Sequence, residues 1–290
     1  MDPEREGRTE AVRFRQANHL GAQPLGDLIT IVEQTTGIDV AVLDTGPDEH
    51  GLTMRDPATE TVFIGVARTR HPMRQRSTLA HELGHVLFED WGVWSSDDSG
   101  GEAGRSSGEV RADAFARHLL LPIEGLGELV KRPGVVDQTV LSNVVQRFMV
   151  SPAIAAIALH QAGWIDYATK QAWMGLTTPQ LAARFGWIDL YRALQEESDR
   201  RRPPQRLLAR AIRGYVEGVI SAQTIATLRG TPLDVAEADL REAGVRPVEA
   251  VPVWADLDEL PGVRVDLDAL DADLARVDND VPGQTARDRE

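Results

Sequence analysis

Residues 81–85 read His-Glu-Leu-Gly-His, and this segment constrains the chain more than any other feature of its sequence. Residues four apart in a helix lie on the same face, about 6 Å apart along the axis. In a helix, His81 and His85 can therefore both direct a ring nitrogen at one metal ion, with Glu82 beside them as a base. The pattern predicts a metal-dependent hydrolase. A surface helix that carries two histidines by coincidence is the alternative.

The residues around this segment predict a helix over 76–87. Ser77 or Thr78 is the expected N-cap, because a hydroxyl there can accept a hydrogen bond from the first turn. Gly84 costs about 1 kcal/mol relative to Ala inside a helix, so it predicts the close approach of a neighbouring element. An apolar stripe suited to a hydrophobic core is formed by Leu79, Leu83, Val86 and Leu87.

Two arrangements supply a third ligand to an H-E-x-x-H helix. In the first, the motif continues as H-E-x-x-H-x-x-G-x-x-H; Phe88 and Trp91 stand at the Gly and final His positions here, which excludes it. In the second, a carboxylate comes from a following helix. Residues 109–121 predict an amphipathic helix that Pro122 helps to end, and Glu109 is its candidate ligand.

Asp113 lies one turn after Glu109 on the same face of that helix. It is the candidate acceptor for the free ring nitrogen of a ligating histidine, whose tautomer it would fix. An ordinary solvated acidic face is the alternative for both carboxylates, and the nearby H-E-x-x-H segment favours the ligand interpretation. His118 is predicted to project from the opposite side of the helix, as a surface or packing histidine.

Three short β-rich segments precede the metal helix and are separated by turn residues. They predict a small antiparallel sheet and hence an α+β fold. The third segment is the candidate edge strand, on which an extended peptide would bind by strand addition across the metal. The segments are 37–43, 51–55 and 61–66.

The chain resembles the ImmA/IrrE family of metallopeptidases in several features taken together. They are a helix followed by a small sheet, residues 74–80 leading into the 81–85 segment, the pattern E-x-x-A-D-x-F-A at 109–116 and L-L-P at 120–122. The resemblance covers roughly residues 20–165. The family often has Phe where this chain has Ser77, a packing difference that leaves the ligands unchanged. The resemblance implies a zincin-like domain and a cytoplasmic bacterial or phage protease that cleaves a repressor or an antitoxin.

The predicted metal ligands are thus His81, His85 and Glu109, with Glu82 as the catalytic general base. This set suits Zn²⁺ best, and Mn²⁺ or Fe²⁺ also bind such ligands. Zinc lowers the pKa of a bound water to about 7, and Glu82 would take its proton and pass it to the leaving amine. A transcriptional regulator or toxin–antitoxin component with a structural or sensing metal site is the alternative function.

The amino-acid composition indicates the cellular compartment in which the protein is expected. The chain has no cysteine, which excludes disulfides and thiolate metal sites and is compatible with a reducing cytoplasm. Its charged first residues lack the apolar run of a signal peptide, and no apolar run reaches the roughly 18 residues of a membrane span. We therefore expect a cytoplasmic protein without a membrane segment.

The length of 290 residues predicts more than one domain. The predicted parts are an N-terminal extension (1–20), a zincin-like domain (21–166), a helical domain (167–248) and an acidic, partly disordered tail (249–290). Residues 231–290 contain six Arg and sixteen Asp or Glu, a net charge of −10 out of −14. Such a block repels nucleic acid. A helix that forms on a partner is predicted over 266–280, and disorder from 282 on.

Residues 141–166 and 205–244 resemble helix-turn-helix units, which raises DNA binding as an alternative. The would-be recognition helix at 152–161 carries no Arg, Lys or Asn, the donors that base and phosphate contacts need. We expect it to pack on the catalytic domain instead. The last helix, ending at Ala243, is acidic, the wrong sign for DNA. The second helical region is therefore predicted to bind a protein partner, a repressor or an antitoxin.

Overall fold

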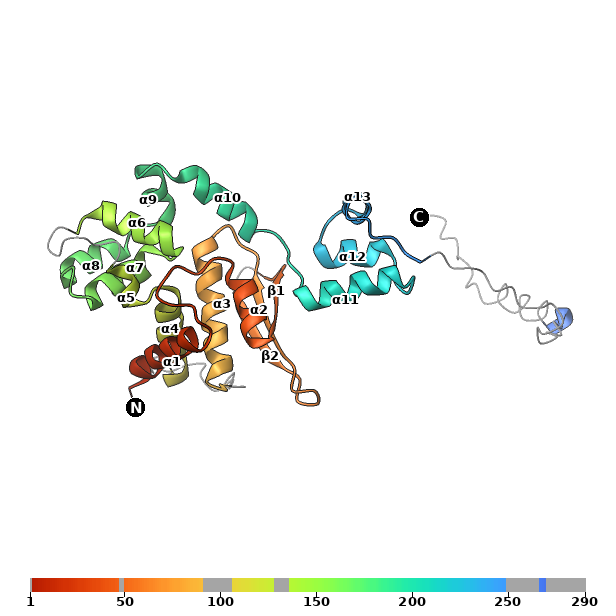
Figure 1. Cartoon of the computed structure of the whole chain (residues 1–290), viewed down its shortest axis with the longest axis horizontal. Coiled ribbons are helices and arrows are strands. Elements are labelled where there is room, and N and C mark those ends of the chain that lie inside the picture. Colours follow the sequence, from red (N-terminus) through yellow and green to blue (C-terminus); the bar gives the residue numbers. More distant parts are fainter. Residues whose placement is uncertain (1, 47–49, 91–105, 128–135, 249–265, 270–290) are drawn as a thin grey trace, which may run out of the picture. The chain divides into compact units, whose positions relative to one another are not determined.

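The computed structural model describes residues 2–46, 50–90, 106–127, 136–248 and 266–269. The chain divides after Val248 into two units. Of the second unit the structure describes only 266–269, so the predictions for the acidic tail lie almost entirely outside the described residues. The first unit is an α+β structure, as predicted, with a three-stranded sheet among many helices (Figure 1).

The strands are β1 (Asp39–Leu43), β2 (Gly51–Arg55) and β3 (Val62–Ala67). The helices are α1 (Pro3–Ala17), α2 (Leu28–Thr36), α3 (Pro72–Leu87), α4 (Ser107–Leu120), α5 (Ile123–Leu126), α6 (Gln138–Phe148), α7 (Pro152–Gln161), α8 (Tyr167–Met174), α9 (Thr178–Arg184), α10 (Ile188–Ser198), α11 (Gln205–Val216), α12 (Ala222–Arg229) and α13 (Leu233–Glu242).

The sheet is mixed, and the prediction of an antiparallel sheet was wrong in this respect. A tight turn, closed by a hydrogen bond from Asp56 N to Thr61 O (2.9 Å), makes β2 and β3 antiparallel neighbours. Strand β1 pairs in parallel with the other side of β3, with Val40 opposite Ile64. Buried residues in a row along β1, Val40 to Val42, suit a strand covered on both faces, which is the environment of parallel pairing.

The strand order is β1-β3-β2, so β3 is central and the prediction of 61–66 as the edge strand was wrong. Ile64 and Val66 of β3 are buried, whereas β2 is half-buried at its start and exposed at its end. The outer side of β1 is itself paired, because Val42 and Arg202 exchange two backbone hydrogen bonds (2.8 and 3.2 Å). Within the described residues β2 is therefore the open edge of the sheet.

Helix α3 is longer than predicted and begins five residues before Ser77. Its N-cap is His71 and Pro72 is its first residue; the side chain of His71 makes no capping hydrogen bond. Proline is favoured at this position because its fixed φ suits a helix and its missing N–H would have had no partner there. Leu79 and Leu83 are buried, and Val86 and Leu87 are partly buried against the core, as the stripe predicts.

Gly84 lets α4 pack closely on α3, which confirms the predicted close approach. A Cβ at Gly84 would lie 3.1 Å from Ala112 Cα and 3.2 Å from Phe115 Cδ1. On its other side α4 packs against α1, where Phe14 meets Phe115 edge-on and Arg15 Nε donates to the Leu119 carbonyl (2.8 Å). Figure 1 shows the three helices side by side.

The main hydrophobic core runs through most of the first unit. It contains Ala11 and Phe14 of α1, residues of the sheet and of α3 to α7, and also Trp173, Trp187 and Tyr191 from α8 to α10. A smaller cluster holds α11 to α13 together: Ala211, Ala222, Ile225 and Leu240. The domain boundaries drawn from the sequence stay predictions.

Helices α6 and α7 form where the sequence predicts a helix, a turn and a helix. Ser151 caps α7 by accepting from Ile154 N (3.2 Å), and most of α7 is buried, in keeping with a packing role. Among the described residues no single helix is long and apolar enough to cross a membrane, and the α6–α7 pair, which reaches that limit only jointly, is bent by 112°.

Candidate metal centre

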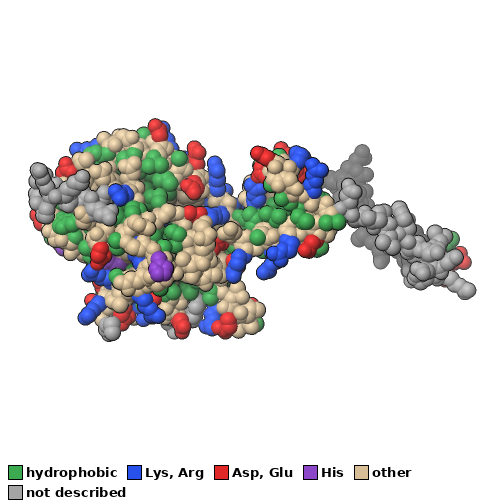
Figure 2. Space-filling view, viewed as in Figure 1, with side chains coloured by type: hydrophobic (Ala, Val, Ile, Leu, Met, Phe, Trp, Pro, Cys, Tyr) green, Lys and Arg blue, Asp and Glu red, His purple; other side chains and the backbone are tan. Residues whose placement is uncertain are grey.

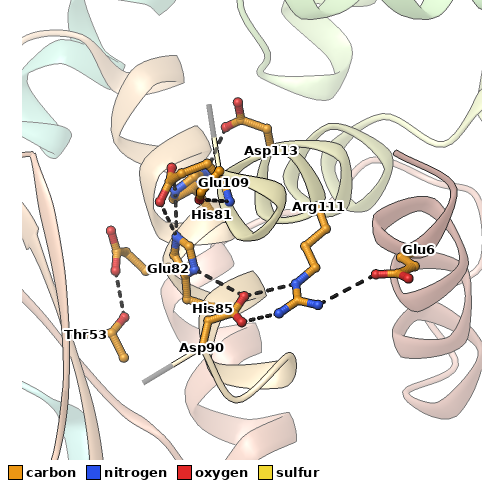
Figure 3. A network of polar contacts seen from close by, with 10 residues as sticks. Glu6, Thr53, His81, Glu82, His85, Asp90, Glu109, Arg111 and Asp113 are labelled. Carbon is orange, nitrogen blue, oxygen red and sulfur yellow. Dashed lines mark hydrogen bonds and ion pairs between the residues drawn. The ribbon is translucent and has the colours of Figure 1, made fainter. Parts of the chain in front are cut away.

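The three predicted metal ligands lie together. His81 Nε2 and His85 Nε2 are 3.0 Å apart, and each lies 3.2 Å from a different carboxylate oxygen of Glu109. Figure 3 shows the two rings and the carboxylate converging on one point. The ligand atoms of these three side chains all lie within 4.8 Å of one another, so the three residues could hold one metal ion.

Two packed helices bring these side chains together. The histidines lie one turn apart on α3, and Glu109 stands in the first turn of α4, which Gly84 allows to approach α3 closely. Ser106 caps α4 by accepting from Glu109 N (3.2 Å). A carboxylate in a first turn is favoured by the positive end of the helix dipole, so α4 both positions the Glu109 charge and stabilises it.

The donor set fits a divalent transition metal. Two imidazole nitrogens and one carboxylate are a ligand set of catalytic zinc sites, which leave a fourth position for water or substrate. The histidine side chains are about one-fifth exposed, at 20% and 18%, and Glu109 is 46% exposed. The cluster is thus open to solvent on the Glu109 side, as substrate access requires.

Asp113 lies behind His81. Its Oδ1 is 2.9 Å from His81 Nδ1, so the two form a hydrogen bond that leaves Nε2 directed at Glu109. Burial alone would lower the pKa of His81, but the hydrogen bond and charge of Asp113, with the charges of Glu109 and Glu82, outweigh burial and raise the pKa. The structure therefore brings Asp113 to the position expected of an orienting carboxylate.

Glu82 faces the sheet. Thr53 Oγ1, on the edge strand β2, donates a hydrogen bond to Glu82 Oε2 (2.7 Å; Figure 3). Gly51 begins the same strand, and a Cβ there would lie 2.5 Å from Thr78 Cγ2 and 2.8 Å from Glu82 Oε1. Only glycine fits at this place without movement, so the backbone of β2 passes directly beside the candidate base.

Sequence reasoning missed two charged residues beside the cluster, Asp90 and Arg111. Asp90 Oδ2 lies 3.7 Å from His85 Nδ1, and Arg111 binds the Asp90 carboxylate through Nε (3.1 Å) and Nη2. The signals were present in the sequence: an acid directly after the metal helix, and an arginine two residues after Glu109. Neither Asp90 nor Arg111 stands at a spacing typical of metal ligands. Their contact forms in space, between the end of α3 and the start of α4.

His118 is buried, which confirms a packing role rather than a ligand role. Its side chain is 5% exposed and lies 3.9 Å from Glu4. Burial lowers the pKa of His118 to about 4; the charges of Arg8 and Arg117 lower it further, against opposing effects of Glu4 and Glu124. His118 thus belongs to the α1–α4 contact.

Comparison with known proteins agrees with this arrangement. The family model of the IrrE N-terminal-like domain matches residues 33–160, which include the sheet, both metal-site helices and all but the last residue of α7. The chain is also similar to the radiation response metalloprotease IrrE of Deinococcus radiodurans, with 28% identity over 151 residues. That alignment covers 51% of this chain and 44% of the relative, so the chain spans less than half of that protein's length.

Through this region the chain is similar to the IrrE N-terminal-like domain of metallopeptidases. A candidate metal cluster on α3 and α4, inside the matched residues, is what a metallopeptidase domain requires.

Proposed function

We propose that this protein is a metal-dependent endopeptidase that cleaves a regulatory protein. The convergence of His81, His85 and Glu109 beside Glu82 carries the proposal. A site that only stabilises the fold needs no base next to its ligands, and here Glu82 is held by a dedicated hydrogen bond from Thr53.

In the proposed reaction His81, His85 and Glu109 hold a Zn²⁺ ion, for which Mn²⁺ can substitute. The ion, when bound, supplies Lewis-acid polarisation of the scissile carbonyl and of the attacking water. Glu82 takes a proton from that water and delivers it to the leaving amine as general acid. Asp113 keeps the ring of His81 in the tautomer that has Nε2 free for the metal.

The substrate is proposed to bind as an extended strand along β2. This strand is the open edge of the sheet within the described residues, Thr53 on it donates a hydrogen bond to Glu82, and a Cβ at its Gly51 would lie 2.8 Å from Glu82 Oε1. Strand addition uses backbone hydrogen bonds and so requires an unfolded or flexible segment of the target. A repressor or an antitoxin in the cytoplasm, encoded beside the protease, is the proposed target, on the family resemblance.

Helices α11 to α13 are proposed to bind the protein partner. Figure 2 shows hydrophobic side chains at the surface of this region between acidic and basic ones. Large exposed hydrophobic residues there are Leu207, Val219, Leu233, Val235 and Val248. Helix α13 carries Asp234, Glu237, Asp239 and Glu242 against Arg241. This combination favours a protein surface over DNA, and the two helix-turn-helix-like units are proposed to serve packing and partner binding.

The substitution Glu82→Gln tests the catalytic role. The variant should keep its circular dichroism spectrum and bind one equivalent of zinc, but it should not cleave the protein encoded by the neighbouring gene. Chelation should stop cleavage by the parent, and added Zn²⁺ or Mn²⁺ should restore it. Cleavage by Glu82→Gln at the parental rate would overturn the mechanism. Zinc binding without any cleavage by the parent would favour the alternative, a sensing or structural metal site in a regulator.

A further inference from the structure

Helix α3 ends in a way that places Asp90 beside His85. Glu89 N donates to Val86 O (3.1 Å) and Asp90 N donates to His85 O (2.9 Å), the two bonds of a Schellman motif. That motif needs a left-handed residue, normally glycine, at the position of Glu89, whose φ is +54°. The non-glycine residue there is uncommon, and the turn it makes brings the next side chain back along the helix.

The Asp90 carboxylate is held by Arg111, whose own position is set by contacts with Phe88 and Glu6. Arg111 of α4 binds this carboxylate through Nε and Nη2. The Arg111 guanidinium lies over the ring of Phe88, 4.9 Å from its centroid, and its Nη1 is 3.7 Å from Glu6 of α1. The side chain of Asp90 is only 15% exposed, whereas Arg111 is 27% exposed. A carboxylate fixed in this way keeps one orientation toward His85.

The two histidines are related in the same way to their carboxylates. Each turns Nε2 toward Glu109 and Nδ1 toward an aspartate, His81 toward Asp113 at 2.9 Å and His85 toward Asp90 at 3.7 Å. A ligating histidine in a metal site commonly donates its other ring N–H to a carboxylate, which sets the tautomer and makes the ligating nitrogen more basic. At His81 the carboxylate is within hydrogen-bond distance; at His85 it is within ion-pair distance.

We propose that Asp90 is a positioning residue for His85: clamped by Arg111, its carboxylate lies 3.7 Å from His85 Nδ1, attracts the proton to that nitrogen and so keeps Nε2 free for the metal. This inference rests on the proposed metal centre and adds to it a second carboxylate–histidine pair. It also gives Arg111 a function, because a guanidinium that binds both carboxylate oxygens fixes the plane of Asp90 as lysine cannot.

Zinc affinity of the full-length chain tests the proposal, measured by competition with a chromophoric chelator. Removal of an orienting carboxylate typically weakens metal binding 10–100-fold, so Asp90→Ala should bind Zn²⁺ at least tenfold more weakly than the parent. Asp90→Glu, which retains the carboxylate, should recover part of the loss. Arg111→Lys should weaken binding less than Asp90→Ala. The matched control is Asp39→Ala, which removes another aspartate–arginine pair (2.8 Å to Arg206) away from the site and should bind zinc like the parent.

A second readout separates positioning from simple structural support. In the zinc-loaded parent, NMR should show slowly exchanging Nδ1 protons on both His81 and His85. Asp90→Ala should lose the His85 signal and keep the His81 signal, and its visible Co²⁺ spectrum should shift. Parental zinc affinity and both protons in Asp90→Ala would overturn the proposal while leaving the metal centre intact. Failure of the parent itself to bind zinc would instead overturn the proposed function.

Discussion

Thr53 Oγ1 donates a hydrogen bond to Glu82 Oε2 over 2.7 Å, and this bond joins the edge strand of the sheet to the metal helix. It links the element proposed to hold the substrate with the group proposed to move the proton. Movement of β2 when a peptide pairs with it would therefore change the position of Glu82. Because a Cβ at Gly51 of the same strand would lie 2.8 Å from Glu82 Oε1, the strand limits the position of the base as well as its own helix does.

Thr53→Val should reduce the rate of peptide cleavage about tenfold. A hydrogen bond to a charged group contributes about 1.5–3 kcal/mol, and about 1.4 kcal/mol corresponds to a tenfold rate change. Zinc affinity should not change, because the hydrogen bond of Thr53 goes to Glu82 and not to one of the three ligands. Cleavage of a fluorescence-quenched peptide library measures the rate, and Thr53→Ser, which keeps the hydroxyl, is the control. Equal rates for the valine variant and the parent would show that the bond does not assist Glu82.

Metal binding should stabilise the fold. A ligand that binds only the folded state at 100 times its Kd adds about 2.7 kcal/mol to the free energy of unfolding. For a unit of this size that corresponds to a rise in Tm of roughly 5–10 °C. Calorimetry of chelator-treated protein with and without Zn²⁺ measures the rise. In His85→Ala the rise should be absent; a similar rise in that variant would place the zinc elsewhere.

Gly84→Val should destabilise the protein by about 1–3 kcal/mol, the usual cost of overpacking a core. Side-chain atoms at this position meet Ala112 and Phe115 of α4, so the two helices must separate. The separation also moves Glu109 from the histidines and should weaken zinc binding. The matched control is Gly175→Val, where a Cβ meets only Ala172 O at 3.6 Å. Urea unfolding measures the free energy of unfolding of the two variants. An equal loss of stability in Gly175→Val and Gly84→Val would contradict the packing argument.

Acid should destabilise the α1–α4 contact through His118. The pKa of His118 is about 4 in the folded protein against 6.5 unperturbed, so between these values the unfolded chain binds more protons. The stabilising contribution is complete above pH 6.5 and is lost as the pH falls toward 4, by about 3 kcal/mol at most. Unfolding free energies measured from pH 7 to 4.5 should fall more steeply for the parent than for His118→Leu. Parallel curves would exclude this role.

The local features of the metal site could be predicted from the sequence. The spacing of His81 and His85, the periodicity of the helix that follows and the cost of Gly84 inside a helix each depend on residues a few positions apart. These signals suffice to indicate α3, α4 and the close approach of a neighbouring element at Gly84, which the structure identifies as α4. They also indicate Glu109 and Asp113, because one helix face carries both residues.

The features that sequence reasoning missed depend on contacts between distant residues. Strand segments were found nearly at their observed bounds, but the parallel pairing of β1 with β3 depends on which edge is free and not on the strand's own residues. Asp90 reaches His85 through a turn whose left-handed residue is Glu89, where a glycine would have signalled the turn. The start of α3 at Pro72 was missed because Ser77 and Thr78 are also good caps.

The backbone bridge between Val42 and Arg202 has a consequence for how this molecule meets other chains. Unpaired strand edges invite pairing with any extended segment, including another copy of the same protein. By pairing with the outer side of β1, Arg202 leaves β2 as the open edge of the sheet within the described residues, the edge whose Thr53 is hydrogen-bonded to Glu82. Under the proposed function, the open edge is the one at which a captured strand can be cut, and the bridge from Arg202 to Val42 opposes pairing of the other edge with a further chain.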